Sequence, residues 1–262
     1  MATVLIAALL YLVATGLLVA LLRRERGGAR SWLLPAVFAI ALHGVVHVLA
    51  WRQSGGTDMH FFAALSLTGL GMAALTAGFG AGGRMQALGV VVYPLAAASL
   101  LAYAGYGRHP AEVLGWRLQL HAWCALLAYA TLAVAALLAM MLWLQERALR
   151  RHRISGWLRA LPPLTELETL LFRTIAAGFV LLSATLLTGV LFVEDLLAQH
   201  LAHKTVFSVL SWLAFGILLL GRWRSGWRGR IAVRWTLAAM ALLVLAFFGS
   251  KFVLELVLQR GP

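Results

Sequence analysis

The sequence predicts an all-α membrane protein, a polytopic bundle of about eight transmembrane helices. Hydrophobic residues make up 62% of the chain, and the mean hydropathy is +0.89. Apolar runs of about 20 residues, the length that crosses a bilayer, recur along the whole sequence. No long polar block separates them, so we expect one transmembrane domain over residues 1–262.

The first four apolar runs predict helices at 2–22, 31–51, 60–80 and 86–106. The arginines of the first run follow it rather than precede it, which indicates a retained helix rather than a signal peptide. The second run contains His43 and His47, four residues apart and therefore on one helix face. Pro94 lies well inside the fourth run, where a kink is expected.

The last four runs predict helices at 117–145, 168–193, 204–221 and 232–256. The first of these opens with His121, which lies just inside the apolar stretch. Pro162 and Pro163 interrupt the chain before the sixth helix. Thr165, followed three residues later by Glu168, predicts a capping box that begins that helix.

The basic residues predict how the helices are oriented. With the N-terminus outside, 16 of the 22 Lys and Arg residues fall on the cytoplasmic side and 6 fall outside. This asymmetry places both chain termini outside. The outer six are Arg52, Arg108, Arg117, Lys204, Lys251 and Arg260. The net charge of +13 is thus explained by topology and anionic lipid headgroups, and no basic face is large enough to bind nucleic acid.

The cysteine content excludes several kinds of site. The chain has one cysteine, Cys124, inside an apolar run. It cannot form an internal disulfide, and no cysteine pair exists for thiol exchange or zinc. Serine, aspartate and histidine occur in no recognisable nucleophile context, so we do not expect an enzyme.

The histidines gather at the outer side, whereas most of the arginines lie inside. Neutral imidazole binds haem iron, and a haem site needs one or two such ligands. His121, His43 and His203 are the candidate iron ligands. Arg117, Lys204 and Lys251 are outer-side cations that suit haem propionates. The His121 face continues through small side chains to Tyr129, which favours close approach of a flat ligand.

The stretch LHAWCALLAYATLAVAALLA resembles a segment of the cytochrome c assembly membrane proteins, the CcsA and CcmC superfamily of haem handlers. In that family a histidine opens a helix, followed by a small-residue segment with an A-Y or G-Y pair, here His121, Ala128 and Tyr129. Thr188 and Gly189 stand at the small-residue turn of the next helix, and HKTVFSVLSW and LAFFGSKFVLEL follow. The resemblance is closest to the YpjD branch and strongest over residues 116–260.

This resemblance implies a multi-pass protein of the bacterial inner membrane that takes part in cytochrome c assembly. It implies haem, written here as haem b, held by histidines near the periplasmic face. Other cytochrome c maturation proteins are the implied partners, and the chain would be at most a haem-handling component of a lyase system. His121 matches the family's external ligand before its tryptophan-rich segment, and His203 stands where that segment ends. The segment itself is replaced by EDLLAQHLAHKT, and Ser250 and Lys251 stand where a second external histidine is expected.

Two other functions stay open at this point. A scaffold or regulator of haem metabolism would keep the fold without haem, and the missing tryptophan-rich segment favours it. A transporter would use embedded histidines as a proton or ion relay. Many transporters have inverted repeats and pairs of broken helices. This sequence shows neither, and it has no mid-membrane carboxylate. For His47, His60, His109, His152 and His200 we expect a hydrogen bond to a neighbouring helix rather than a ligand role.

Overall fold

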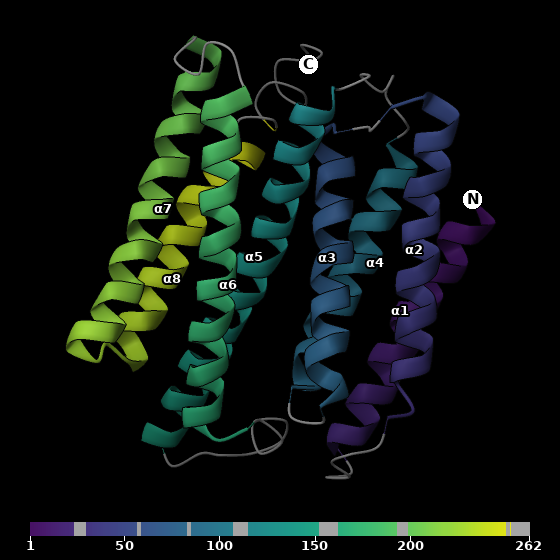
Figure 1. Ribbon diagram of the computed structural model, residues 1–262. Helices are drawn as coiled ribbons and strands as arrows, with labels where there is room; N and C mark the ends of the chain where they lie inside the picture. The colour runs from purple at the N-terminus through teal and green to yellow at the C-terminus, as the bar shows by residue number, and fades with distance from the viewer. Residues whose placement is uncertain are drawn as a thin grey trace. The chain divides into compact units, whose positions relative to one another are not determined.

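The computed structural model describes residues 1–23, 30–56, 59–82, 85–106, 115–151, 162–192, 199–249 and 252, without the side chains of 199–203. All regular structure in these ranges is helical (Figure 1). The elements are α1 (Ala2–Arg23), α2 (Leu33–Ser54), α3 (Phe61–Ala81), α4 (Ala87–Gly105), α5 (Trp116–Arg150), α6 (Leu164–Phe192), α7 (Gln199–Ser225), α8 (Gly229–Val244) and the π-helical turn η2 (Leu245–Gly249). Within the described ranges, 8 helices are long and apolar enough to cross a membrane. The predicted all-α class is confirmed.

The start of α6 differs from the prediction. The helix begins at Leu164, directly after the two prolines, so Thr165 lies inside the helix and does not cap it. Proline suits a position just before or at the first helical residue, because its fixed φ is helical and it has no N–H to satisfy. The predicted capping box is therefore wrong, and the Glu168 carboxylate has another partner.

That partner is the beginning of α8. Glu168 Oε1 accepts a hydrogen bond of 2.9 Å from the backbone N–H of Gly229, and its other oxygen lies 3.9 Å from the Arg222 guanidinium. Arg222 also donates to the carbonyl of Trp227 at 3.3 Å. The α7–α8 turn needs positive φ at Gly226 and Gly229, +63° and +52°, which glycine adopts at little cost.

The last predicted helix is also divided. The α-helical part ends at Val244, and residues 245–249 form the π-helical turn η2. A π turn changes the spacing of the backbone hydrogen bonds, and such turns are frequent at functional sites. In the remainder of the predicted helix, residues 250, 251 and 253–256 lie outside the described residues.

The chain forms two compact units, which we describe separately. Unit 1 comprises Met1–Val113 and Arg147–Pro163, and unit 2 comprises Leu114–Glu146 and Leu164–Pro262. The single transmembrane domain expected over residues 1–262 stays a prediction.

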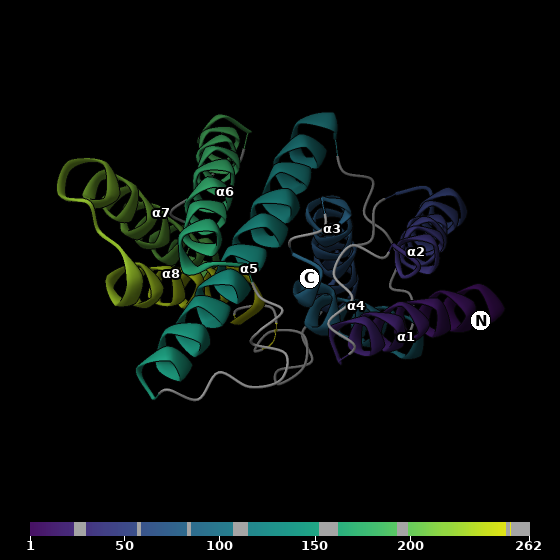
Figure 2. The same ribbon diagram turned by 90° about the horizontal axis from the view of Figure 1, so that it is seen from below.

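Unit 1 contains a ring of four helices. α1 packs against α2 and α4, and α3 packs against α4 and α2, as the end-on view shows (Figure 2). Small residues permit this close packing. A Cβ on Gly80 would lie 2.7 Å from the Trp32 ring, and a Cβ on Gly89 would lie 2.5 Å from Leu18.

Unit 2 is joined by polar links as well as apolar packing. The Trp212 indole on α7 donates to Ser183 Oγ on α6 at 2.8 Å. Ser211 Oγ on α7 donates to the carbonyl of Ala239 on α8, also at 2.8 Å. Gly178 of α6 faces Leu132 of α5 so closely that a Cβ would lie 2.5 Å from it. Large apolar side chains on the outside of these helices, such as Val180 at 66% exposed, suit a lipid environment.

Candidate functional site

His121 lies in the second turn of α5 and is tied to α6. Its Nδ1 lies 3.1 Å from the backbone carbonyl oxygen of Thr185 and 3.2 Å from Thr188 Oγ1. A carbonyl oxygen only accepts hydrogen bonds, so Nδ1 must carry the proton and donate it. The neutral ring then has its lone pair on Nε2, which has no hydrogen-bond partner among the described residues. This is the arrangement in which a histidine ligates a metal.

Gly189 determines how closely the imidazole approaches α6. A Cβ at this position would lie 3.3 Å from His121 Cε1 and 3.6 Å from Nδ1. Side-chain atoms rarely pack more closely than that, so any larger residue would press on the ring. The small-residue turn predicted from Thr188 and Gly189 thus lies against His121: Thr188 Oγ1 is within hydrogen-bond distance of the imidazole, and Gly189 leaves room for the ring.

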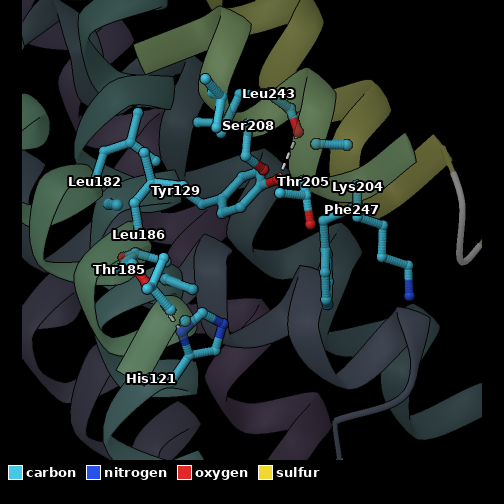
Figure 3. Close-up of a pocket in the computed structure, with 16 residues that line it drawn as sticks. His121, Tyr129, Leu182, Thr185, Leu186, Lys204, Thr205, Ser208, Leu243 and Phe247 are labelled. Atoms are coloured by element: carbon cyan, nitrogen blue, oxygen red, sulfur yellow. Dashed lines mark hydrogen bonds between the residues drawn. The ribbon is translucent and has the colours of Figure 1, made fainter. Parts of the chain in front are cut away.

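His121 faces a cavity of about 230 Å³ inside unit 2. Figure 3 shows the His121 ring on one wall and Phe247 on another, with Lys204 beside Phe247. Most of the lining is apolar, and α5, α6, α7, α8 and η2 all contribute to it. The lining includes His121, Tyr129, Thr185, Gly189, Lys204 and Phe247.

Tyr129 joins α5 to the π turn. Its hydroxyl donates to the backbone carbonyl of Leu243, just before η2. Its ring lies 5.9 Å from the Phe247 ring and 5.5 Å, edge to face, from the Phe248 ring. The predicted cofactor-binding role of Tyr129 is consistent with its place in the wall, but the hydroxyl proton is already used by Leu243. Tyr129 therefore offers the cavity its ring.

The predicted cations have different surroundings. Lys204 lines the cavity. Arg117 is exposed and lies 5.6 Å above the Trp116 ring and 5.9 Å from the Phe192 ring, outside the cavity lining. Lys251 lies outside the described residues, and His203 belongs to the helical part of α7 whose side chains are not described.

His43 belongs to unit 1 and is enclosed there. It is 0% exposed. Its Nδ1 lies 3.2 Å from the Tyr11 hydroxyl, and its Nε2 lies 2.9 Å from Ser66 Oγ. Both ring nitrogens are thus engaged, in contrast to those of His121. Its predicted role as an iron ligand stays a prediction.

Sequence reasoning missed Thr185 and Phe247. The role of Thr185 belongs to its backbone carbonyl, which no residue type reveals. Phe247 enters the cavity wall because the helix changes to a π turn at Leu245. Across the described residues, no group of three or more His, Cys, Asp or Glu side chains could hold a metal ion. A haem iron needs only one or two protein ligands, so this finding leaves a haem site open.

The chain is similar to proteins of cytochrome c assembly. The family described as Cytochrome C assembly protein matches residues 30–258. The Inner membrane protein YpjD of Escherichia coli (strain K12) is 29% identical over 260 residues, which is 97% of this chain and 98% of that protein. An uncharacterized 28.8 kDa protein of Azospirillum brasilense is 41% identical over 143 residues, covering 54% of this chain and 53% of its own length.

A more distant likeness is to the Cytochrome c biogenesis protein CcsA of Prochlorococcus marinus (strain MIT 9515). It is 29% identical over 90 residues, 34% of this chain and 29% of that protein. No solved structure matches the chain. These findings confirm the resemblance inferred from the sequence. With the 8 membrane-length helices of the described ranges, they also confirm the predicted multi-pass inner-membrane location.

Proposed function

We propose, from the premise that this chain belongs to the cytochrome c assembly protein family, that it is an inner-membrane protein that binds haem at His121. One observation carries the proposal. The Thr185 carbonyl holds the Nδ1 proton of His121, so the lone pair of Nε2 is available beside a largely apolar cavity. A haem there would be haem b, and it would supply an iron for axial ligation and electron transfer.

The residues around His121 are of the chemical types that a haem requires. Leu182, Leu186 and Val190 offer apolar walls, Gly189 leaves room at the imidazole, and Lys204 offers a cation for a propionate. A volume of about 230 Å³ is less than the ~300–1,000 Å³ of typical ligand sites. We therefore expect part of the ring to enter the described space, and the wall formed by η2 to move when haem binds.

The other predicted residues enter the proposal in different ways. His203 remains a candidate to hold the iron together with His121, and Lys251 remains a candidate to contact a propionate. Arg117 remains a candidate for a propionate at the cavity rim. His43 suits an iron less well, because a ligand nitrogen would first have to give up Tyr11 or Ser66.

The family and the likeness to a cytochrome c biogenesis protein support a role beside other maturation components. We place the His121 end of α5 at the periplasmic face, with both termini outside, from the asymmetry of the basic residues. Two exposed serines test this orientation: Ser54 at the end of α2 and Ser225 at the end of α7. In a Cys124→Ala background, a membrane-impermeant maleimide should label Ser54→Cys in intact cells, and Ser225→Cys only after lysis.

The haem proposal is tested by the optical spectrum of the detergent-purified protein, oxidised and then reduced with dithionite. Wild type expressed with haem supplied should show a Soret band and sharp reduced α and β bands. His121→Ala should lose or shift them. Cys124→Ala is the matched control, because Cys124 lies three residues further along α5, could donate a thiolate to iron, and does not line the cavity.

Each outcome has a definite meaning. Haem lost from His121→Ala and kept in Cys124→Ala supports the assignment to His121. Haem kept in both variants removes His121 as the ligand. A wild type without a Soret band contradicts haem binding, and the scaffold or regulator function then takes its place.

A further inference from the structure

A column of polar rings runs through unit 1. Its members, in order, are His60, Tyr103, His47, His43, Tyr11, Tyr93 and Trp32. Consecutive ring centroids lie between 4.7 and 6.1 Å apart. His60 precedes α3, at the end of the unit where α2 finishes, and Trp32 precedes α2 at the other end. The column thus passes along the four helices from one end of the unit to the other.

The middle of the column is a continuous chain of hydrogen bonds. The Tyr11 hydroxyl lies 3.2 Å from His43 Nδ1. His43 Nε2 lies 2.9 Å from Ser66 Oγ, and the same Ser66 oxygen lies 3.0 Å from His47 Nε2. Tyr11, His43 and Ser66 are each 0% exposed. Three different helices, α1, α2 and α3, therefore contribute to one buried chain.

This chain has two equivalent directions. Each hydroxyl and each neutral imidazole has one proton to donate along the chain. In one direction Tyr11 donates to His43, His43 to Ser66, and Ser66 to His47. In the other direction every bond is reversed. A proton that enters at one end and another that leaves at the far end convert the first arrangement into the second, which is the requirement for a proton relay.

Beyond Tyr11 the column reaches Tyr93 and Trp32, and two further polar side chains of the described ranges, without a hydrogen-bond partner there, lie in the same half of the unit. Tyr93 OH, Trp32 Nε1, Thr76 Oγ1 and Gln86 Nε2 are buried and have no hydrogen-bond partner among the described residues. All four lie in the half of the unit where α2 and α4 begin and α3 ends. A buried polar group without a hydrogen-bond partner is unfavourable, and a bridging water is the usual way to satisfy it. These atoms mark a place where water would continue the chain.

Charged side chains are kept out of this path. Among the described residues of α1 to α4, the charged side chains are Arg23 and Arg52, each in the last turn of its helix. The titratable groups that face the relay are the histidines and tyrosines of the column itself. The buried chain therefore has no ion pair to stabilise, and ion pairing does not explain why polar groups are buried here.

We propose that unit 1 conducts protons along this column, independently of haem binding in unit 2. A proton taken up at the His47 side is followed by transfer from His47 Nε2 to Ser66, from Ser66 to His43 Nε2, and from His43 Nδ1 to Tyr11. Tyr11 releases its own hydroxyl proton toward Tyr93. One proton enters and one leaves, no residue keeps a charge, and rotation of the hydroxyls with tautomer exchange of the imidazoles restores the starting direction.

The test is proton flux into liposomes that contain the purified full-length protein and a pH-sensitive dye in the lumen. A potassium gradient with valinomycin supplies the driving potential. Ser66→Ala removes the oxygen between the two histidines. We expect its flux to fall by roughly tenfold or more, because a broken hydrogen-bond chain leaves adjacent groups without a partner. Ser99→Ala is the matched control, since Ser99 is also buried in unit 1 but donates only to Ala96 O of its own helix.

Tyr11→Phe is a second variant, which keeps the ring packing and removes the hydroxyl. Circular dichroism and gel filtration establish that each variant is folded. Flux that is lost in Ser66→Ala and Tyr11→Phe, kept in Ser99→Ala and slowed in D₂O supports the relay. The proposal is overturned if wild type is no faster than protein-free liposomes, if Ser66→Ala equals wild type, or if Ser99→Ala is equally slow.

Discussion

In unit 1, His43 has a side-chain partner on each ring nitrogen, Tyr11 on Nδ1 and Ser66 on Nε2, and its ring has no exposed surface. In unit 2, His121 is half-buried, and among the described residues only its Nδ1 has a hydrogen-bond partner. Both histidines lie in apolar helices and look alike in the sequence. The difference lies in Nε2. A histidine whose Nε2 is hydrogen-bonded links helices, whereas a histidine whose Nε2 has no such bond is available to a ligand.

The largest expected effect distinguishes the two histidines by stability. His43→Ala leaves a buried void and removes a partner from both Tyr11 and Ser66, so we expect it to cost about 3 kcal/mol of unfolding free energy. His121→Ala removes one hydrogen-bonded ring beside an existing cavity and should cost about 1 kcal/mol. Thermal unfolding in detergent, with haem omitted, measures both. Equal destabilisation by the two variants would contradict the difference in structural role between His43 and His121.

The next largest effect is expected on haem affinity when the space between Gly189 and the His121 ring is filled. Leucine at Gly189 has to displace the imidazole, because even a Cβ would lie 3.3 Å from Cε1. We expect Gly189→Leu to weaken haem binding roughly tenfold or more, comparable to the loss of a residue that orients a metal ligand. Haem titration followed at the Soret band measures the affinity.

Gly16→Leu is the control for that variant. Gly16 also lies inside a helix, but a Cβ there meets nothing within 4 Å. Its haem affinity should equal that of wild type. If Gly189→Leu binds haem as tightly as Gly16→Leu, the packing of Gly189 against His121 does not position the imidazole.

A smaller effect is expected at the π turn. Tyr129→Phe keeps the ring in the cavity wall and removes the hydrogen bond to the Leu243 carbonyl. We expect a loss of about 1 kcal/mol in stability. Hydrogen exchange of the amides in η2 should become faster, while those of α5 stay unchanged. Unchanged protection in η2 would mean that Tyr129 does not hold the turn.

The smallest effect belongs to Thr188. Thr188→Val removes the second oxygen near His121 Nδ1 but leaves the Thr185 carbonyl in place. The tautomer should be kept, and haem affinity should fall by about 2- to 3-fold, below the ~10–100-fold range typical of losing an only partner. A loss as large as that of Gly189→Leu would show that Thr188, rather than the carbonyl, orients the ring.

Much of the fold could be predicted, because membrane length and hydropathy alone determine where helices lie. All eight predicted runs correspond to helices that the structure describes, and most ends agree within a few residues. The predicted start of α6 was wrong, because the threonine and the glutamate with capping spacing both lie inside the helix, as its second and fifth residues. The spacing does not reveal that Glu168 has a partner 61 residues further along.

The site could be predicted only in part. His121 and Gly189 were both singled out from the sequence, but their contact depends on how α5 and α6 pack. The place of His43 and His47 on one face was predicted from their spacing. Their shared partner, Ser66, belongs to another helix and is an ordinary serine in the sequence. Pairings between helices are set by packing that a single sequence does not display.

The contact between Glu168 and Gly229 has a consequence for how the protein is made. The carboxylate that satisfies the first N–H of α8 comes from α6, which is synthesised before the α7–α8 turn. When the ribosome releases that turn, its acceptor is already in the membrane, and the hairpin can close as it inserts. A chain that lacks α6 would present the same hairpin without its cap, so α6 would act as a template for the insertion of the helices that follow it.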